Sequence, residues 1–358
     1  MSTITDIHRS PQQFVLAITG GGSAAISDLL SEPGASETVL EAIVPYHAGA
    51  LSDFLGRQPD SAVSLETARN LAMVSWLRAK ALSDFPDAQQ NLIGFGATSS
   101  LSTDRTRRGK NQCFIALQSA NEITEISLRL IKGRSRQDEE RLIADVILHF
   151  IARASGVELA LPVMDEIISE RSQRASNSWK KLHQGSLSTY EGEHPIAVFP
   201  GAFNPLHQGH RDMVAVAEEC LNQTVHLEIS IRNVDKPPID FLTMSDRAEQ
   251  IDNPLIFSNA PTFIEKTEAY PGATFIVGAD TMLRIADNKY YDGFDIDAAI
   301  YKMTTSGVSF LVFGRVIDNQ FSELADLALP DALMALCTGV KSAEFRSDIS
   351  SSDMRRRV

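Results

Sequence analysis

The first half of the chain alternates short apolar runs with segments whose apolar residues recur at helical spacing. Residues 14–18 are continuously apolar, residues 19–23 read Thr-Gly-Gly-Gly-Ser, and an apolar-periodic segment continues to Leu30. This order predicts a buried strand, a glycine loop and a helix. Further strands are predicted at residues 92–97, 113–117 and 125–130, and further helices from Ser64 to Leu82 and from Ser135 to Ile151, the last ending near Gly156.

The chain becomes polar between about residues 169 and 194. This stretch contains Ser-Gln-Arg-Ala-Ser-Asn-Ser and then Gly-Ser-Leu-Ser-Thr-Tyr-Glu-Gly-Glu, a composition that favours a connector. We therefore expect an α/β domain over residues 1–157, a helix and polar linker over residues 158–193, and a second domain over residues 194–358.

The second half repeats the alternation of strand and helix. Strands are predicted at residues 196–199, 225–231, 275–277 and 310–313, and helices at residues 209–220, 245–251 and 279–286. Strands that alternate with helices in this way predict a parallel sheet with helices on both faces. The expected fold class is α/β, with two domains that are each a sheet covered by helices.

Composition restricts the partners more than the fold. At 358 residues the chain is long enough for two to three domains of ~150 residues. Its 33 basic and 46 acidic residues give a net charge of −13, which opposes nonspecific binding to nucleic acid. No apolar run approaches the ~20 residues of a membrane span, and residues 1–11 lack the apolar core of a secretion signal. We expect no nucleic-acid partner, no membrane association, and a cytoplasmic location with the nucleus as an alternative.

The cysteines are Cys113, Cys220 and Cys337, an odd number spread far apart. They form neither a disulfide framework nor the paired spacing of a zinc site. We interpret them as reduced core thiols.

The most informative segment is residues 199–210, Phe-Pro-Gly-Ala-Phe-Asn-Pro-Leu-His-Gln-Gly-His, between a predicted strand and a predicted helix. It places His207 and His210 at a helix N-terminus, where backbone N–H groups and the helix dipole already favour an anion. Gly201 would allow the backbone to approach a ligand closely, and Gly209 would allow a tight start of the helix. The segment predicts a binding site for a nucleotide.

Two later segments support this prediction. Residues 275–280 end a hydrophobic strand in Gly278 and Asp280, at the edge of a parallel sheet that binds ligands. Near the end of the chain, Ser350 and Ser351 precede Arg355, which offers capping hydroxyls and a cation for a second anion site.

Together these motifs resemble the nucleotidylyltransferase superfamily with the His-x-Gly-His signature, and within it most closely the nicotinamide mononucleotide (NMN) adenylyltransferases. The matching elements are Gly-x-Phe-Asn-Pro-x-His-x-Gly-His, Gly-x-Asp after a middle strand, Ile-Ser-Ser-x-x-x-Arg near the end, and Met244-Ser245-Asp246-Arg247 at the start of a helix. The resemblance covers residues 194–358. It implies a Rossmann-like parallel-sheet domain that transfers an adenylyl group from ATP to a mononucleotide, NMN or nicotinate mononucleotide, and releases pyrophosphate.

The resemblance also implies roles for individual residues. His207 and His210 would hold the triphosphate, and Arg355 with Ser350 and Ser351 would hold its β and γ groups. Gly278 and Asp280 would hold the ribose, and Gly201, Ala202 and Phe203 would run along the nucleotide. Mg²⁺ would be carried by the phosphates of ATP, so no protein metal site is expected. Lys236 is either a further phosphate-binding cation or a loop lysine in solvent.

The sequence leaves open both the identity of the acceptor and the activity of the domain. The family stacks nicotinamide on a tryptophan beyond Gly-x-Asp, whereas this chain has Tyr290 and Tyr291 there, which are either stacking residues or core residues. A phosphopantetheine, cytidylyl or other acceptor therefore stays open. The alternative functions are a nucleotide-binding sensor or scaffold, and an ATP-hydrolysing relative.

Residues 12–157 resemble the competence/damage-inducible CinA family, whose active members deamidate NMN. The matching elements are Thr19-Gly20-Gly21, Pro33-Gly34-Ala35-Ser36, Val44-Pro45-Tyr46 and Val63-Ser64-x-Glu66-Thr67-Ala68-Arg69. The family carries Glu-Ser-Cys before Thr-Gly-Gly and a lysine after the tyrosine, but here Leu16-Ala17-Ile18 and Leu51 occupy those positions.

Because a serine needs a base to attack an amide, we expect this domain to be catalytically inactive, with Ser23 as a substitute only in a rearranged loop. It would then hold a nucleotide phosphate without chemistry, or form the interface of a homo-oligomer.

Overall fold

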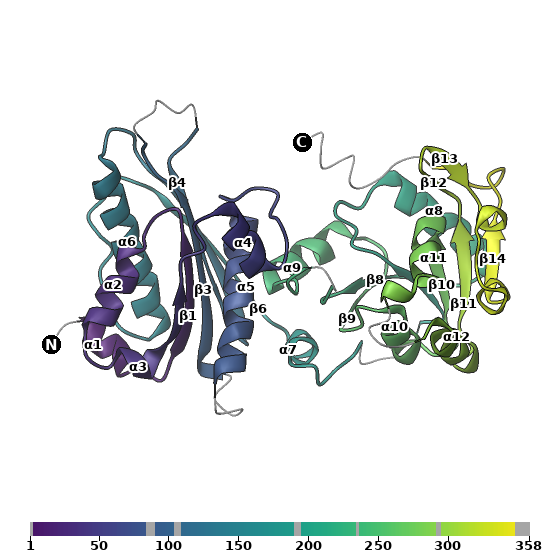
Figure 1. Cartoon of the computed structure of the whole chain (residues 1–358), viewed down its shortest axis with the longest axis horizontal. Coiled ribbons are helices and arrows are strands. Elements are labelled where there is room, and N and C mark those ends of the chain that lie inside the picture. The colour runs from purple at the N-terminus through teal and green to yellow at the C-terminus, as the bar shows by residue number, and fades with distance from the viewer. Residues whose placement is uncertain are drawn as a thin grey trace. The chain divides into compact units, whose positions relative to one another are not determined.

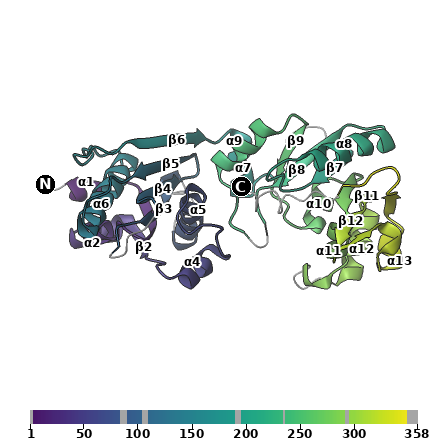
Figure 2. The same ribbon diagram turned by 90° about the horizontal axis from the view of Figure 1, so that it is seen from above.

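The computed structural model describes residues 3–83, 90–103, 109–189, 195–233, 236–290 and 295–347. The chain divides into two compact units, residues 1–176 with 235–243 and residues 177–234 with 244–358 (Figures 1 and 2). Each unit has its own sheet and hydrophobic core, so the fold class expected from the sequence is confirmed.

The first unit contains a mixed six-stranded sheet. Its strands, in spatial order, are β2 (Val39–Ile43), β1 (Gln13–Thr19), β3 (Leu92–Ser100), β4 (Gln112–Gln118), β5 (Glu122–Arg129) and β6 (Ile168–Arg174). β2, β1 and β3 are parallel. The remaining pairings are antiparallel.

Helices cover both faces of this sheet, as Figure 1 shows. They are α1 (Thr3–His8), α2 (Ala24–Ser31), α3 (Ala35–Thr38), α4 (Ala48–Leu55), α5 (Leu65–Leu82) and α6 (Arg136–Ala154). Because successive strand residues point to opposite faces, Leu16 and Ile18 of β1 pack in the core that contains α2 and α6. Val15 packs with Trp76 of α5 on the other face.

The segment that the sequence suggested as a helix and polar linker, residues 158–193, contributes to both units. Its residues 168–174 form β6, which pairs with β5 along its whole length. Most β6 side chains are exposed, because an edge strand keeps its place through backbone hydrogen bonds and does not need an apolar face. α7 (Asn177–Gln184) follows and belongs to the second unit. Residues 235–243 belong to the first unit, where Asp240 forms an ion pair of 3.4 Å with Arg69.

The second unit is built on a six-stranded sheet in which all strands are parallel. Its strands, in spatial order, are β14 (Cys337–Val340), β11 (Ser309–Phe313), β10 (Thr274–Gly278), β7 (Ala197–Pro200), β8 (Val225–Ser230) and β9 (Leu255–Ser258). Numbered along the chain, this is the Rossmann order 6-5-4-1-2-3. The strand order reverses between β7 and β10, so this pair forms the switch point of the sheet.

The helices of this unit are α8 (Gln208–Leu221), α9 (Phe241–Gln250, whose first three residues belong to the first unit), α10 (Phe263–Ala269), α11 (Ala279–Ile285), α12 (Ile296–Thr305) and α13 (Asp331–Met334). A short hairpin, β12 (Arg315–Ile317) and β13 (Gln320–Ser322), follows β11. The main core lies between the sheet and α10, α11 and α12, where Phe275 and Phe310 pack with Tyr270 and Met303.

The cysteines do not all lie in the core. Cys113 is buried and Cys337 is partly buried, but Cys220 is exposed near the end of α8, which corrects the prediction of three core thiols. Within the described ranges, no helix is both long enough and apolar enough to cross a membrane.

Candidate functional site

The loops that follow β7 and β10 leave the carboxyl edge of the second sheet on the two sides of its switch point. In open parallel sheets this is where ligands bind, because the neighbouring connections run to opposite faces and leave a crevice. The loop after β7 carries His207 and His210, and the turn after β10 carries Gly278 and Asp280. The two sequence motifs therefore emerge from neighbouring strands.

The loop between β7 and α8 is held by contacts from other elements. Gly201 N–H donates to the carbonyl of Glu228 in β8 over 2.9 Å. Phe203 is buried with a φ of 44°, a conformation that is uncommon for a side chain of this size. Its carbonyl accepts a hydrogen bond of 3.2 Å from Arg247 Nη1 in α9. Arg247 thus helps to position the loop.

The two histidines are stacked at the first turn of α8. Their ring centroids are 3.6 Å apart and nearly parallel. The backbone N–H of His207 donates to Nδ1 of His210 over 3.3 Å, so the neutral His210 ring carries its proton on Nε2, which donates to no other described residue. Nδ1 of His207 is buried without a hydrogen-bond partner among the described residues. Nε2 of His210 is therefore the ring nitrogen that can donate to a ligand.

Burial keeps both imidazoles neutral. Phe199 and Phe203 pack edge-on around His210, with centroids at 6.0 and 5.2 Å. Desolvation by this environment, followed by the nearby His207 and Arg315, lowers the pKa of His210 to about 3. The pKa of His207 is also lowered, by desolvation and then by Arg315. Both rings can therefore donate a hydrogen bond at neutral pH without carrying a charge.

Arg315, at the start of β12 directly after β11, is a site residue that sequence reasoning missed. Its guanidinium is close enough to depress the pKa values of both histidines, and burial lowers its own pKa while Asp280 opposes that shift. A pattern in the sequence could have identified Arg315. A strand that ends at Phe313 is followed by Gly314 and a charged residue, much as the neighbouring strand β10 ends in Gly278 shortly before Asp280.

Gly278 lies against the side chains of both Asp280 and Arg315. A Cβ atom at this position would lie 2.5 Å from Asp280 Oδ1 and 3.0 Å from Arg315 Cγ, both closer than van der Waals contact allows. Gly209 has a similar role at the start of α8, where a Cβ would lie 2.6 Å from Ser347 Oγ. Glycine at these positions lets the site groups approach one another.

Some of the remaining predicted site residues are described by the structure, and others lie outside the described residues. Ala202 and Lys236 are exposed, and Gly201 is half-buried beside the ring of Phe203. Tyr291, Ser350, Ser351, Arg355 and the side chain of Tyr290 lie outside the described residues. Ser347, which is described, lies against Gly209 and so brings the chain to the first turn of α8. In the described part of the chain, no group of three or more His, Cys, Asp or Glu side chains has the arrangement of a metal site.

The first unit has a pocket of about 440 Å³ beside its glycine loop. Gly20 and Gly22 have φ values of 79° and 87°, which explains the first and third glycines of the Thr-Gly-Gly-Gly motif. Ser23 lies at the edge of the pocket, where its Oγ donates to Glu140 over 3.0 Å. Sequence reasoning missed Arg136, Gln137 and Glu140 as pocket residues, because α6 lies more than a hundred positions after the loop.

The positions at which the CinA resemblance would place a serine and a lysine are Ala17 and Leu51. Both are buried, and they pack in one apolar cluster with Leu55 and Leu71. The fold therefore brings the two positions together but supplies no nucleophile and no base there.

Comparison with known proteins gives one family match. Residues 198–357 match the cytidylyltransferase-like family model, which supports a nucleotidyltransferase domain in this part of the chain. No curated protein matches the chain.

Two solved structures are similar to part of the chain. The competence or damage-inducible protein from Enterobacter asburiae has 18% identity and a TM-score of 0.33, and the similarity covers 43% of this chain and 92% of that one. The competence/damage inducible protein CihA from Agrobacterium tumefaciens has 19% identity and a TM-score of 0.32, with 42% and 96% covered.

Proposed function

We propose that the second unit transfers an adenylyl group from ATP to a mononucleotide, NMN or nicotinate mononucleotide, with release of pyrophosphate. The observation that carries this proposal is the convergence of His207, His210 and Arg315 at the carboxyl edge of the sheet. Three donors of this kind, with one fixed positive charge, suit the oxygens of a polyphosphate. The family match to residues 198–357 supports the reaction class.

In the proposed reaction, a phosphate oxygen of the acceptor attacks the α-phosphorus of ATP. A new P–O bond forms, the bond between the α-phosphorus and the bridging oxygen breaks, and pyrophosphate leaves with that electron pair. No covalent intermediate with the protein is required, so the protein contributes positioning and stabilisation of the charge that develops on phosphoryl oxygens.

Each site residue has a separate role in this proposed reaction. His210 donates from Nε2 as a neutral ring, because burial lowers its pKa to about 3. Arg315 supplies a fixed positive charge that burial leaves poorly screened by solvent. Asp280, exposed on the first turn of α11, is proposed to accept hydrogen bonds from the ribose hydroxyls. Mg²⁺ enters with ATP as part of the substrate, and Ser350, Ser351 and Arg355 are proposed to hold the β and γ phosphates.

The test is an assay of the full chain with MgATP and one acceptor at a time: NMN, nicotinate mononucleotide, phosphopantetheine, or no acceptor. Pyrophosphate release and the adenylylated product are both measured. The proposal expects pyrophosphate and dinucleotide in equal amounts with a pyridine mononucleotide. Phosphate or pyrophosphate without an acceptor would indicate ATP hydrolysis, and ATP binding without turnover would indicate a sensor; each overturns the proposal.

A matched pair of histidine variants assigns the activity to the site. His210→Ala is expected to lower kcat by about 10²–10³-fold, as for the loss of one preorganised donor. His226→Gln, in β8 of the same unit and away from the motif, is expected to retain activity. Equal activity of the two variants would remove the role proposed for His210.

A further inference from the structure

The anion-binding position of the first unit is already filled by a side chain of the protein. The glycine loop and the start of α2 present the backbone N–H groups of Gly22 and Ala24 and the hydroxyl of Ser23. All of them donate to the carboxylate of Glu140, over 2.7, 3.1 and 3.0 Å. These are the donors that a phosphate uses when it binds at a glycine loop and helix N-terminus.

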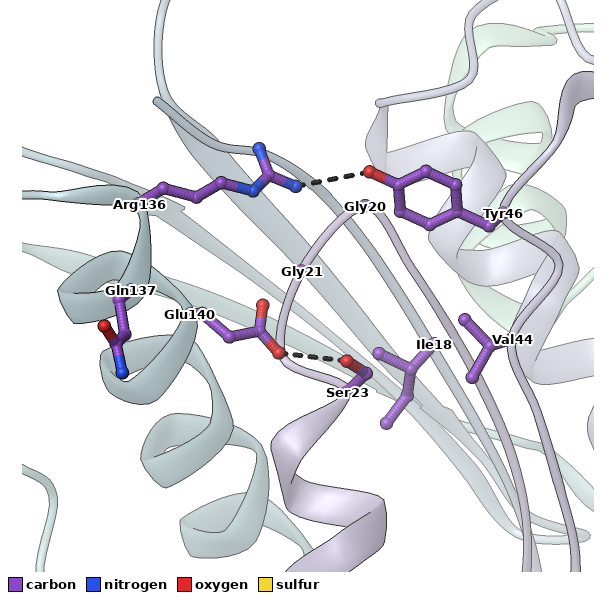
Figure 3. Close-up of a pocket in the computed structure, with 9 residues that line it drawn as sticks. All are labelled: Ile18, Gly20, Gly21, Ser23, Val44, Tyr46, Arg136, Gln137 and Glu140. Carbon is purple, nitrogen blue, oxygen red and sulfur yellow. Dashed lines mark hydrogen bonds between the residues drawn. The ribbon is translucent and has the colours of Figure 1, made fainter. Parts of the chain in front are cut away.

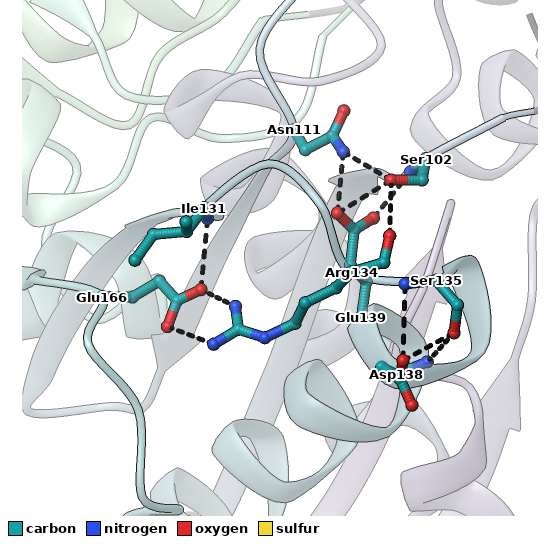
Figure 4. Close-up of polar contacts among 8 residues, drawn as sticks. All are labelled: Ser102, Asn111, Ile131, Arg134, Ser135, Asp138, Glu139 and Glu166. Carbon is teal, nitrogen blue, oxygen red and sulfur yellow. Dashed lines mark hydrogen bonds and ion pairs between the residues drawn. The ribbon is translucent and has the colours of Figure 1, made fainter.

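The start of α6 fixes Glu140 in this position. Ser135 and Asp138 form a capping box there. The neighbouring Glu139 is fully buried and accepts hydrogen bonds from Ser102 N, Ser102 Oγ and Asn111 Nδ2, over 2.6, 2.9 and 2.7 Å (Figure 4). These contacts anchor the first turns of the helix and so fix the backbone from which the Glu140 side chain extends.

The other walls of the pocket are apolar and aromatic. Figure 3 shows Val44 and Tyr46 on the side opposite α6, with Ile18 between Val44 and Ser23. Tyr46 is 66% exposed and Val44 is 47% exposed, so both present a free face to the pocket. Arg136 donates to the phenol oxygen of Tyr46 over 3.2 Å and to the carbonyl of Ser102 over 3.1 Å, which directs two of its nitrogens to protein acceptors.

We propose that this pocket binds a planar heteroaromatic molecule that carries no phosphate, and that Glu140 excludes the phosphorylated form of the same molecule. The ring would lie against Tyr46, and an amino or amide N–H of the ligand would donate to Glu140. A pocket of about 440 Å³ has room for a nucleoside. A phosphate would meet a carboxylate where it needs donors, and two like charges about 4 Å apart disfavour binding by at least ~10-fold. This site is separate from the one proposed for adenylyl transfer.

The experiment uses a matched pair of probes, adenosine and adenosine 5′-monophosphate (AMP), on the full chain. Hydrogen–deuterium exchange read by mass spectrometry resolves the first unit from the second, because peptides that cover residues 18–26 and 136–146 report this pocket alone. In the wild type, adenosine is expected to slow exchange in these peptides and AMP is expected to leave them unchanged. Equal protection by both probes, or no protection by adenosine at millimolar concentration, would overturn the proposal.

A variant tests the role of the carboxylate. Glu140→Ala is expected to let AMP protect the same peptides, with an apparent affinity at least tenfold above that of the wild type. Asp145→Ala removes a carboxylate that pairs with Arg141 on the same helix and is 41% exposed, and it is expected to behave as the wild type. Continued exclusion of AMP by Glu140→Ala would overturn the role of Glu140, and the comparison of probes on the wild type stands even if this variant folds poorly.

Discussion

Replacement of Gly278 by Ala tests whether the close approach of Asp280 and Arg315 to this glycine matters for catalysis. The backbone of Gly278 is extended, with φ −82° and ψ 156°, so alanine brings no backbone strain and the added methyl group is the whole perturbation. That methyl carbon would lie 2.5 Å from Asp280 Oδ1, 3.0 Å from Arg315 Cγ and 3.1 Å from Arg315 Nε. Restoring ordinary contact requires the two side chains to move by up to roughly 1 Å.

We expect Gly278→Ala to lower the reaction rate more than it lowers the stability of the second unit. Displacing positioning groups by about 1 Å can lower a rate by ~10²-fold, which corresponds to about 2.7 kcal/mol of transition-state stabilisation. Overpacking costs ~1–3 kcal/mol of stability in a dense core, and we expect the lower end because Asp280 is exposed and can rotate. The melting temperature of the second unit should therefore fall by only about 2–4 °C.

The assay measures steady-state pyrophosphate release with MgATP and the active acceptor, together with a thermal melt. Gly339→Ala is the matched control, because this glycine lies in edge strand β14 and the three atoms nearest to its Cβ position all belong to the side chain of Leu324, at 3.1 Å or more. We expect the control to be within twofold of the wild type. A Gly278→Ala protein with wild-type kcat/KM would refute the assignment of Gly278, Asp280 and Arg315 to the site.

Four further predictions follow from individual contacts. Arg315→Gln should lower kcat by about 10²–10³-fold and raise the pKa values of His207 and His210, because a positive charge that depresses both is removed; NMR titration of the histidines checks the second effect. The pKa of His210 lies near 3 when folded and near 6.5 in the unfolded chain, so its neutral ring contributes stability that is present above pH 6.5 and lost as the pH falls toward 3. Urea unfolding between pH 7 and 4.5 should therefore show a steeper loss for the wild type than for His210→Gln, by up to ~1.4 kcal/mol per pH unit. Lys266→Met should destabilise the second unit by about 3–5 kcal/mol, since Lys266 Nζ lies 2.8 Å from both carboxylate oxygens of the fully buried Glu228, and the double variant with Glu228→Leu should recover most of that loss in the same urea measurement. The chain should release no ammonia from NMN, because Ala17 and Leu51 supply neither nucleophile nor base; release that Ser23→Ala abolishes would contradict this.

Local patterns in the sequence were enough to locate most strands and the main motif. The run at residues 14–18 became β1, and its alternate residues fill the cores on the two faces of the sheet. The histidine motif lies between a strand and a helix, as predicted. These features depend on periodicity and on glycine placement within about a dozen residues, and such information is contained in a short window of sequence. β6 was missed for the same reason, because a polar edge strand has no apolar pattern to recognise.

Only the tertiary structure decided which distant groups meet. Arg315 lies near His207 and His210 because β11 lies beside β10, which lies beside β7 in the parallel sheet. The sequence of a single strand does not specify this order of strands. Glu140 reaches Gly22 across 118 positions of sequence, because α2 and α6 pack on the same face of the first sheet. The sequence determined the anion-binding loop, and packing decided that the protein's own carboxylate fills it. The physical reason is that a loop's donors are local, whereas their partners are chosen by the pairing of strands and the burial of helix faces.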